Sequence, residues 1–480
     1  MKKAKIIAMC VLGLFLVLGM VTPTVWAAEK EYKVSYSQFQ KQKNFFDDPR
    51  PYLKDLSYKK VMPPEDYAKL TYDVKAMKNL WAEVIGLRAP DLVGKIAPEI
   101  KPGTYTYKDK EKYPGLKELM IPRHYDRFKP GAPPHGGNFS EITVIPTRQY
   151  YHGLPIAEAT KKNVGRTKLD EQGYIKSETY MAGYPFPRPS GKFKAQQIMN
   201  NWEKRYLMGE NFFAIQFMKG FDKRLNLDFE GGLDWWEVRL NGRVTLEPYG
   251  WYDKRAEAHK EATGCLLGFV APRDTAGTAF SMVYYLDPDR FDLYHIYISV
   301  LRRIRKMSAT DAQDAVSGQD TIYEDRMGFS QKLSKNRYPY SYDLIDEREY
   351  LVPSTTLDGS LYVDSKGIEF RNLEFERRPL YVIKLTQTDK NYVYGQRILY
   401  IDKETFNVIY IENYDQKGRL YRITHPLFGF IPEMGLFTPT YVLFADYIDL
   451  HSAFAFFYSM PATWVERKHI NLGGLVKRGK

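Results

Sequence analysis

The chain contains little cysteine, and its few histidines stand apart from one another. Of 480 residues only two are cysteine and eight are histidine, with no His-x-His or His-x-x-x-His pair. Cys265 lies between Gly264 and two leucines, so we interpret it as a small buried side chain, with a catalytic thiol as the alternative. The composition excludes a disulfide scaffold, and the sequence predicts neither a metal site nor a cofactor.

The sequence also lacks the short motifs that many enzymes use. It contains no Gly-x-Ser-x-Gly, no Gly-x-Gly-x-x-Gly and no phosphate-binding loop, because Gly191-Lys192 is followed by Phe193. Carboxylates gather at Asp311 with Asp314 and over residues 320–325, a composition typical of solvated turns and salt-bridge partners. We therefore predict that the protein is not an enzyme and has no catalytic residue. The alternative is a cell-envelope hydrolase that uses these carboxylates.

Only the N-terminus carries a long uninterrupted apolar run. Three lysines precede this run, which covers residues 6–21 and is followed by Pro23 and then by the small Ala27. This order predicts a signal peptide, residues 1–27, cleaved after Ala27 on export to the periplasm. An uncleaved anchor is the alternative, but a membrane span needs about 20 apolar residues. Met9 is too large to precede a lipidated Cys10, so we expect no lipid anchor.

The chain is basic, with a formal charge of +12. Its Lys and Arg residues are dispersed rather than gathered in one block, and an exported protein meets little nucleic acid. We therefore expect no nucleic-acid partner and an anionic membrane surface or lipid headgroup as the counterpart.

Aromatic residues and turn formers predict a mainly β fold. Phe, Trp and Tyr make up 15% of the chain, and 34 Gly and 28 Pro punctuate it. Alternating patterns predict an antiparallel meander that needs an apolar cover on one face. Its predicted elements are hairpins over residues 235–246 (turning at Asn241-Gly242), 360–370 and 397–411, and strands over residues 380–385 and 419–423.

Two amphipathic helices are predicted. One follows Pro63-Pro64, carries a stripe from Tyr67 to Ile85 and ends at Gly86. The other carries Ala195, Ile198, Met199, Trp202 and Tyr206 on one face. The aromatic segment from Pro426 to Tyr458 is interrupted by prolines and acids, so we expect edge strands and loops that pack on the sheet.

Six phrases occur in an order that resembles a known family, the large uncharacterised Gram-negative periplasmic proteins labelled outer-membrane lipoprotein-sorting protein. They lie within residues 183–422 and are Gly183-Tyr-Pro-Phe-Pro187 with Asn201-Trp-Glu-Lys-Arg-Tyr206; Ala271-Pro-Arg-Asp-Thr-Ala-Gly-Thr278; Val300-Leu-Arg-Arg-Ile-Arg-Lys-Met307; Gly318-Gln-Asp-Thr-Ile-Tyr-Glu-Asp325; Tyr394-Gly-Gln-Arg-Ile-Leu-Tyr-Ile-Asp-Lys-Glu-Thr405; and Asn413-Tyr-Asp-Gln-Lys-Gly-Arg-Leu-Tyr-Arg422. The third and fourth phrases are also similar to the wider LolA/LolB-like superfamily.

The resemblance implies a mainly antiparallel α+β fold, a LolA/LolB-like unclosed β half-barrel with a helical lid, whose ligand is an acyl chain. The corresponding domain expectation is an N-terminal extension over residues 28–182, the half-barrel core over residues 183–425, and a C-terminal aromatic tail over residues 426–480 that packs on the core.

The implied function is that of a soluble periplasmic carrier. It takes a lipid, lipoprotein acyl chains or other lipophilic cargo towards the outer membrane, between an inner-membrane exporter and an outer-membrane acceptor. The alternative is a non-enzymatic docking subunit of an envelope transport complex.

Candidate ligand-binding residues come from the predicted helix and hairpins. We expect the cargo cavity to be lined by Phe186, Trp202, Tyr206, Leu399 and Ile401, with ordinary core as the alternative. Arg303 and Arg305 share one face of a predicted strand, so we expect them to pair either with Glu324 and Asp325 or with an anionic headgroup.

Overall fold

The computed structural model describes residues 57–131, 135–307, 313, 320–355, 357, 360–364 and 366–474. The predicted signal peptide, Asp311 and Asp314 lie outside the described residues, so cleavage after Ala27 stays a prediction.

One long antiparallel sheet organises the molecule. Its first half is a meander that runs through β14 (Glu374–Gln387), β15 (Gln396–Asp402), β16 (Val408–Tyr414), β17 (Leu420–Ile431), β18 (Leu436–Asp446) and β19 (Ser452–Pro461). Its second half runs through β3 (Asn211–Phe221), β4 (Leu227–Arg239), β7 (Glu261–Ala271), β8 (Ala279–Tyr285), β9 (Leu293–Ile298) and β10 (Arg303–Lys306). The two halves are joined where β19 pairs with β3.

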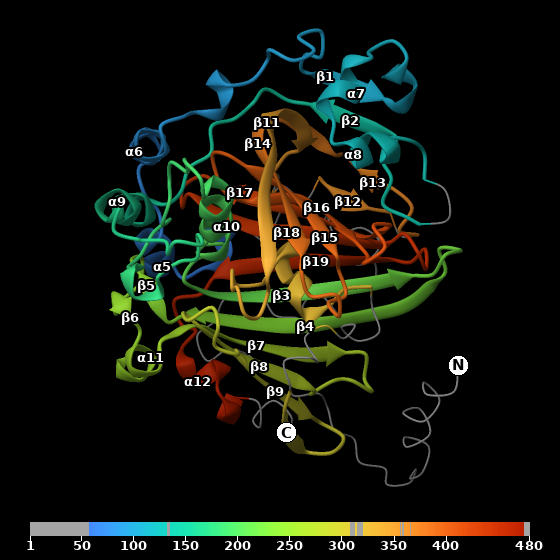
Figure 1. The fold of residues 1–480 in the computed structure, drawn as a ribbon. Coiled ribbons are helices and arrows are strands. Elements are labelled where there is room, and N and C mark those ends of the chain that lie inside the picture. The colour runs from blue at the N-terminus through green and yellow to red at the C-terminus, as the bar shows by residue number, and fades with distance from the viewer. Residues whose placement is uncertain are drawn as a thin grey trace, which may run out of the picture.

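The sheet is unclosed, as the family resemblance implies. One end is extended by β2 (Glu141–Val144), which contacts β14 in parallel and carries β1 (Gly103–Thr106), and β11 (Tyr340–Pro353) also pairs with β14. The other end is β10. In Figure 1 β3 and β4 run across the view while β11 and β14 run almost vertically, so the sheet turns strongly along its length.

Both faces of the sheet are buried. On β3, Phe213 and Phe217 belong to one hydrophobic cluster, whereas Phe212 and Ala214 belong to another. Since neighbouring side chains on a strand point to opposite faces, the two clusters lie on opposite sides of the sheet. Burial on both faces explains why β19 is apolar and aromatic along nearly its whole length.

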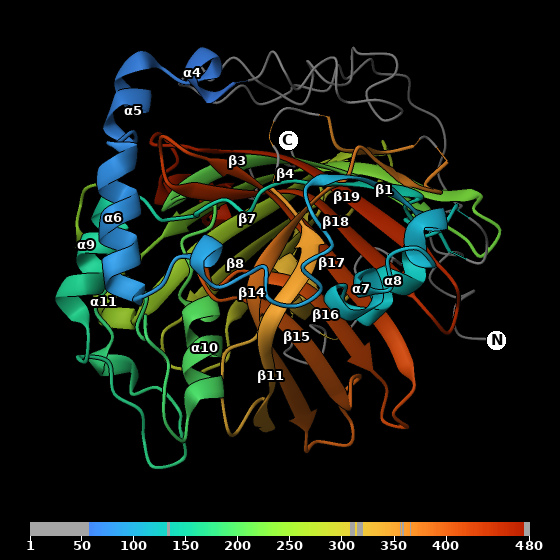
Figure 2. The same ribbon diagram turned by 90° about the horizontal axis from the view of Figure 1, so that it is seen from above.

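Different helices cover the two faces. The face that carries Phe212 is covered by α6 (Val74–Ile85), α9 (Leu154–Asn163) and α10 (Lys194–Glu203), and the other face by α4 (Tyr58–Val61), α7 (Gly115–Leu119) and α12 (Arg467–Ile470). Figure 2 shows α6 and α7 on opposite sides of the strands, with α8 (Pro122–Arg127) beside α7. Short elements complete the fold: α5 (Pro64–Lys69), α11 (Lys254–His259), β5 (Asn241–Arg243), β6 (Gly250–Trp251), β12 (Tyr362–Val363), β13 (Phe370–Arg371), η1 (Ala89–Asp91), η2 (Tyr107–Lys110), η3 (Ser177–Thr179) and η6 (Tyr323–Gly328).

The predicted helices are present, but the first is broken. It consists of α5 and α6, because Asp73 accepts a hydrogen bond of 2.6 Å from the backbone N–H of Ala76 and so starts a new helix. The predicted end at Gly86 is confirmed, with a positive φ of 77°. The second predicted helix is α10, which ends at Glu203, so Tyr206 lies just beyond it.

Two of the three predicted hairpins are confirmed. The 397–411 hairpin is β15 with β16, the 360–370 hairpin is β12 with β13, and the strand over 380–385 lies inside β14. The predicted hairpin over 235–246 is wrong, because β4 pairs with β7, ends at Arg239, and is followed by β5, which pairs with β6 in a separate small sheet. The Glu210 carboxylate accepts hydrogen bonds from the backbone N–H groups of residues 244–246, which therefore need no strand partner.

The C-terminal aromatic segment does not form edge strands. Against that expectation, β18 and β19 lie in the middle of the sheet, with β19 between β18 and β3. Long apolar strands with unpaired edges would expose their backbone polar groups, and a central position pairs both edges.

A buried carboxylate holds the N-terminal part of the chain against the sheet. Glu404, in the β15–β16 turn, accepts hydrogen bonds from the backbone N–H groups of Ala89 (2.9 Å) and Tyr150 (2.8 Å). Its charge is balanced by Arg378 at 2.7 Å, and Trp81 donates to its backbone carbonyl at 2.8 Å. The N-terminal segments are therefore fixed to the sheet by polar contacts as well as by packing.

Two buried histidines contact each other where α8 meets β17. The rings of His124 and His425 are 4.6 Å apart, and both side chains are almost fully buried. Burial and the nearby Arg127 guanidinium lower the pKa of His425 to about 3. This side chain is therefore neutral in the folded protein at every pH where the fold is expected to work.

We expect His425 to make the fold acid-sensitive. The unfolded histidine takes up a proton near its ordinary pKa of about 6.5, whereas the folded one does not until about pH 3, so stability is lost as pH falls through this window. His425→Phe should remove about 2 kcal/mol of the loss in unfolding free energy between pH 7 and pH 5, measured by urea titration. The exposed His259→Gln is the control. Equal pH dependence in wild type and His425→Phe would contradict the assignment.

Candidate ligand-binding site

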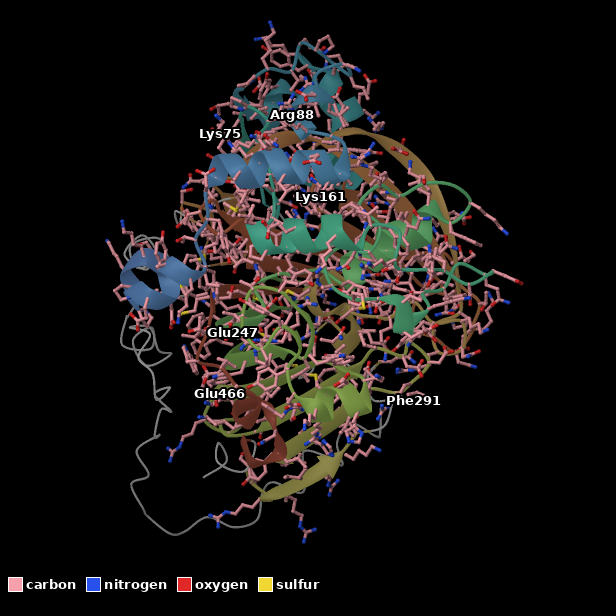
Figure 3. All side chains as sticks on the ribbon, turned by 90° about the vertical axis from the view of Figure 1, so that its left-hand side faces the viewer. Lys75, Arg88, Lys161, Glu247, Phe291 and Glu466 are labelled. Carbon is pink, nitrogen blue, oxygen red and sulfur yellow. The ribbon has the colours of Figure 1, made fainter. Side chains whose placement is uncertain are left out.

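Two cavities adjoin near the C-terminal end of α10. The outer one has a volume of about 610 Å³ and the inner one about 120 Å³, and Tyr180, Asn241 and Leu286 line both. Figure 3 faces this side of the molecule, on which Glu247, between β5 and β6, and Phe291, between β8 and β9, are labelled. The shared wall residues make the pair one candidate site with two compartments.

The outer cavity is formed by five separate stretches of chain, one of which contributes Lys335. The other four are the segment over residues 170–181, the β5–β6 region, Lys260 after α11, and the β8–β9 turn. Ile175, Tyr180 and Leu286 form a small hydrophobic cluster here, and Trp251 packs against it. Lysines and carboxylates complete the wall, so an apolar patch lies among charged groups.

Tyr206 joins the walls of the site. The backbone N–H of Gly183 donates to its hydroxyl oxygen at 2.8 Å, and that hydroxyl donates to the carbonyl of Gly242 at 2.7 Å. Gly242 has a φ of 70°, which glycine adopts without strain, and Tyr180 lies against it. The 170–181 segment, the end of α10 and β5 are therefore locked together around one phenol.

The inner cavity is strongly charged. Five cationic and three carboxylate side chains line it: Arg205, Arg239, Arg326, Lys204, Lys332, Glu203, Glu210 and Glu237. Lys204 pairs with Glu203 at 2.8 Å, and Arg326 pairs with Glu237 at 3.0 Å. Neither Arg205 nor Arg239 has a carboxylate within 4.0 Å in the part of the chain that the structure describes.

Aromatic rings support each of the three guanidinium groups. Arg205 lies 3.9 Å from the centroid of Trp202, and Arg239 lies 3.9 Å from that of Tyr206. Arg326 is 4.9 Å from the ring of Trp235. Such stacking orients a guanidinium and leaves its N–H edge for another partner.

The electrostatics of the inner cavity favour an anion. Burial, together with the neighbouring charge of Arg326, lowers the pKa of Arg205 to about 9. Two buried donors at this cavity, Nε of Arg326 and Nε1 of Trp235, have no hydrogen-bond partner within the described residues. A buried N–H without an acceptor is costly, so a negatively charged ligand oxygen would satisfy it.

Two of the predicted cavity residues, Trp202 and Tyr206, pack against arginines that line the inner cavity. Trp202 and Tyr206 are almost fully buried and contact the guanidinium groups of Arg205 and Arg239, which line the inner cavity. Trp202 itself donates a hydrogen bond of 2.7 Å to the carbonyl of Phe329. These two side chains therefore contact the residues of the cavity wall and are not part of that wall.

The other three predicted cavity residues lie away from both cavities. Leu399 and Ile401 are fully buried in the hydrophobic cluster that α10 covers, and Phe186 is half-buried. Phe186 is held through its backbone, which exchanges two hydrogen bonds with Asn201. Their role as cargo-contacting residues stays a prediction.

The predicted charged pairs form differently. Arg303 and Arg305 are exposed on β10 at the end of the sheet. Asp325 instead pairs with the buried Arg397 at 2.5 Å and accepts a hydrogen bond of 2.7 Å from Tyr394. The structure therefore does not bring Arg303 or Arg305 to Asp325.

Glu324 is held by neutral donors. It accepts hydrogen bonds from Gln331 (2.7 Å), Tyr338 and Tyr392, and burial raises its pKa. With Asp325 it anchors η6, which kinks at Arg326 and Met327 and thereby presents Arg326 to the inner cavity.

Cys265 is fully buried, and burial raises the pKa of its thiol to about 12. The sequence interpretation as a small buried side chain is confirmed, and a thiol with this pKa is a poor nucleophile.

Sequence reasoning missed the three arginines of the inner cavity. Arg205 lies within one of the familiar phrases, but Arg239 and Arg326 come from a strand end and from η6. Because stacking partners and cavity walls come from distant parts of the chain, spacing along the sequence carries no signal for their convergence. The one usable sign was the aromatic-basic phrase Trp202-Glu-Lys-Arg-Tyr206.

Among the described residues, no group of three or more His, Cys, Asp or Glu side chains could hold a metal ion. No helix in this part of the chain is long and apolar enough to cross a membrane.

The fold and site define a mainly antiparallel protein with an unclosed sheet and a two-compartment cavity at its side. Residues 135–465 match the family model described as "Protein of unknown function (DUF1329)", and the chain belongs to this family. The resemblance drawn from the six phrases is thereby confirmed. No curated protein matches the chain.

The solved structures to which the chain is similar include three bacterial proteins. A DUF1329 family protein from Desulfovibrio piger is 15% identical, with 55% of this chain and 91% of that chain covered and a TM-score of 0.40. A domain assigned to the outer-membrane lipoprotein-sorting proteins, from Vibrio parahaemolyticus, is 17% identical (58% and 97% covered, TM-score 0.41). A LolA superfamily protein from Nitrosomonas europaea is 13% identical (58% and 98% covered, TM-score 0.36).

We expect the Arg397–Asp325 pair to be critical for stability and the β10 arginines to be dispensable. Arg397→Met leaves a buried carboxylate uncompensated and should lower the unfolding free energy by about 3–5 kcal/mol, measured by urea titration. Arg303→Ala, at an exposed position, should change it by less than about 0.5 kcal/mol. Comparable losses in the two variants would show that Asp325 is not anchored as described.

Proposed function

We propose that this protein is a non-enzymatic periplasmic carrier that binds a lipid, lipoprotein acyl chains or another lipophilic cargo. The observation that supports the proposal is the outer cavity of about 610 Å³, whose wall includes the Ile175, Tyr180 and Leu286 cluster. A cavity of this size lies within the range of small-molecule sites, and each methylene buried in it contributes about 0.8 kcal/mol.

The proposal includes export and transfer. The N-terminal segment is a signal peptide cleaved after Ala27, and the mature protein works in the periplasm between an inner-membrane exporter and an outer-membrane acceptor. The helical cover of one sheet face and the segment over residues 170–181 form the lid of the carrier, and cargo enters beside that segment.

A docking subunit of an envelope transport complex is the second candidate, and one observation favours it. At the β10 end of the sheet, Val300 and Leu301 are 75% and 51% exposed, next to the exposed Arg303 and Arg305. An exposed strand edge with apolar and basic side chains suits pairing with another chain at an anionic surface.

Native mass spectrometry of the protein purified from its own periplasm separates the two candidates. A carrier should retain a stoichiometric lipophilic molecule that organic extraction releases and identifies. A ligand-free mass, together with no binding of added amphiphiles, would overturn the carrier proposal and leave the docking subunit.

We also expect the outer cavity to bind an uncharged apolar probe, N-phenyl-1-naphthylamine, with a rise in its fluorescence. Met181, on the cavity wall, is 53% exposed, so Met181→Lys should be tolerated by the fold and should weaken probe binding about fivefold or more. Val164→Lys is the matched control, because Val164 is 56% exposed and does not line either cavity. Equal affinities in the two variants would place the probe elsewhere.

A further inference from the structure

The inner cavity carries an excess of donors that the protein itself does not use. Arg205 donates a hydrogen bond of 2.8 Å to the carbonyl of Trp202, and Arg239 donates one to the carbonyl of Arg205. The hydrogen-bond acceptors of both guanidinium groups are therefore main-chain oxygens and not carboxylates. The Glu210 carboxylate is occupied by the backbone N–H groups of residues 244–246. These two guanidinium groups therefore form no ion pair among the described residues, although Tyr206, Glu210 and Glu237 act on Arg239 at longer range and its pKa is raised.

Retaining such charge in a largely buried place is costly. Arg205 and Arg239 lie within one cavity with Arg326, and burial together with the charges of Arg326 and Arg239 lowers the pKa of Arg205, whereas Tyr206 raises that of Arg239 and Tyr284 that of Arg326. The stability of the fold does not require these buried charges, because hydrophobic side chains of similar volume often stabilise a protein interior as well as buried ions do. A bound anion would remove the repulsion.

The donors also converge in a suitable geometry. Three guanidinium groups, each held against an aromatic ring, line a space of about 120 Å³, and Trp235, whose buried indole N–H has no partner among the described residues, is also part of its wall. A cavity needs roughly 10–15 Å³ of volume open to a water-sized sphere to hold one water molecule. The inner cavity is several times larger, so a phosphate or carboxylate group fits. Planar guanidinium groups match these oxyanions through paired N–H···O hydrogen bonds.

We propose that the inner cavity binds a phosphate or carboxylate headgroup, and that the outer cavity holds the apolar part of the same molecule. The cargo is then an anionic amphiphile. This inference rests on the proposed carrier function, because the two compartments act on one ligand only if that ligand has an apolar part. The shared wall of Tyr180, Asn241 and Leu286 is the place where headgroup and chain meet.

Binding measurements with chosen probes test the inference. The probes are dodecyl phosphate and dodecyl maltoside, which have the same chain and differ in headgroup charge, both below their critical micelle concentrations, and inorganic phosphate. Wild type should bind dodecyl phosphate at least tenfold more tightly than dodecyl maltoside. Arg205→Gln and Arg239→Gln should each weaken dodecyl phosphate at least tenfold and leave dodecyl maltoside unchanged.

Two further measurements accompany this experiment, a matched charge-removal variant and a readout on the wild-type protein. Arg273→Gln, at an exposed position in the β7–β8 turn, removes the same charge away from the cavity and should leave all affinities unchanged. In wild type labelled with ¹⁵N, the indole N–H signal of Trp235, assigned through Trp235→Phe, should shift downfield on adding dodecyl phosphate and stay in place with dodecyl maltoside. This second readout needs no arginine variant to fold.

The possible outcomes distinguish failure of the headgroup site from failure of the proposed carrier function. Binding of both dodecyl probes with no effect of Arg205→Gln or Arg239→Gln would overturn the headgroup site and leave the carrier standing. A Trp235 shift with inorganic phosphate, without binding of either dodecyl probe, would mean a free-anion site and would overturn the carrier. No binding of any probe would overturn both.

Discussion

The pairing of β19 with β3 is the contact on which the architecture depends. It joins the meander that ends the chain to the set of strands that begins at residue 211, over a register from Ser452–Phe221 to Pro461–Phe212. Without it the sheet would be two separate pieces, each with a long apolar edge exposed to water. With it, one sheet is continuous between β14 and β10, and helices can bury both of its faces.

Buried ions then fix what packs on the sheet. Glu404 with Arg378 holds the N-terminal segments, and Asp325 with Arg397 holds η6. Both pairs are completed by further hydrogen bonds, which is the condition under which burying a salt bridge is tolerable. The inner cavity differs from these clusters because Arg205 and Arg239 have no such carboxylate partner among the described residues. That contrast within one molecule is why we regard the cavity as a binding site rather than another structural ion cluster.

Much of the fold was accessible from local patterns. Periodicity and turn chemistry placed α10, the β15–β16 hairpin and the β12–β13 hairpin, because neighbours in the sequence form these elements. The failures have particular causes. Asn241 and Gly242 lie inside β5, which pairs with β6, and the distant Glu210 takes the backbone donors that a strand returning along β4 would have used. The apolar stripe from Tyr67 to Ile85 predicted a single helix. The structure has two, because Asp73 caps the N-terminus of a new helix, α6.

The sequence by itself determined the family, the mainly antiparallel class of fold and the buried state of Cys265, and the unclosed sheet was implied by the family resemblance. These follow from composition, period and ordered motifs, which are properties of the chain read in order. Only the tertiary structure decided the central position of β18 and β19, the partner of Asp325, and the meeting of Arg205, Arg239 and Arg326 at one cavity. Pairing partners and cavity walls depend on distances in space between residues far apart in the chain, and no local pattern encodes those distances.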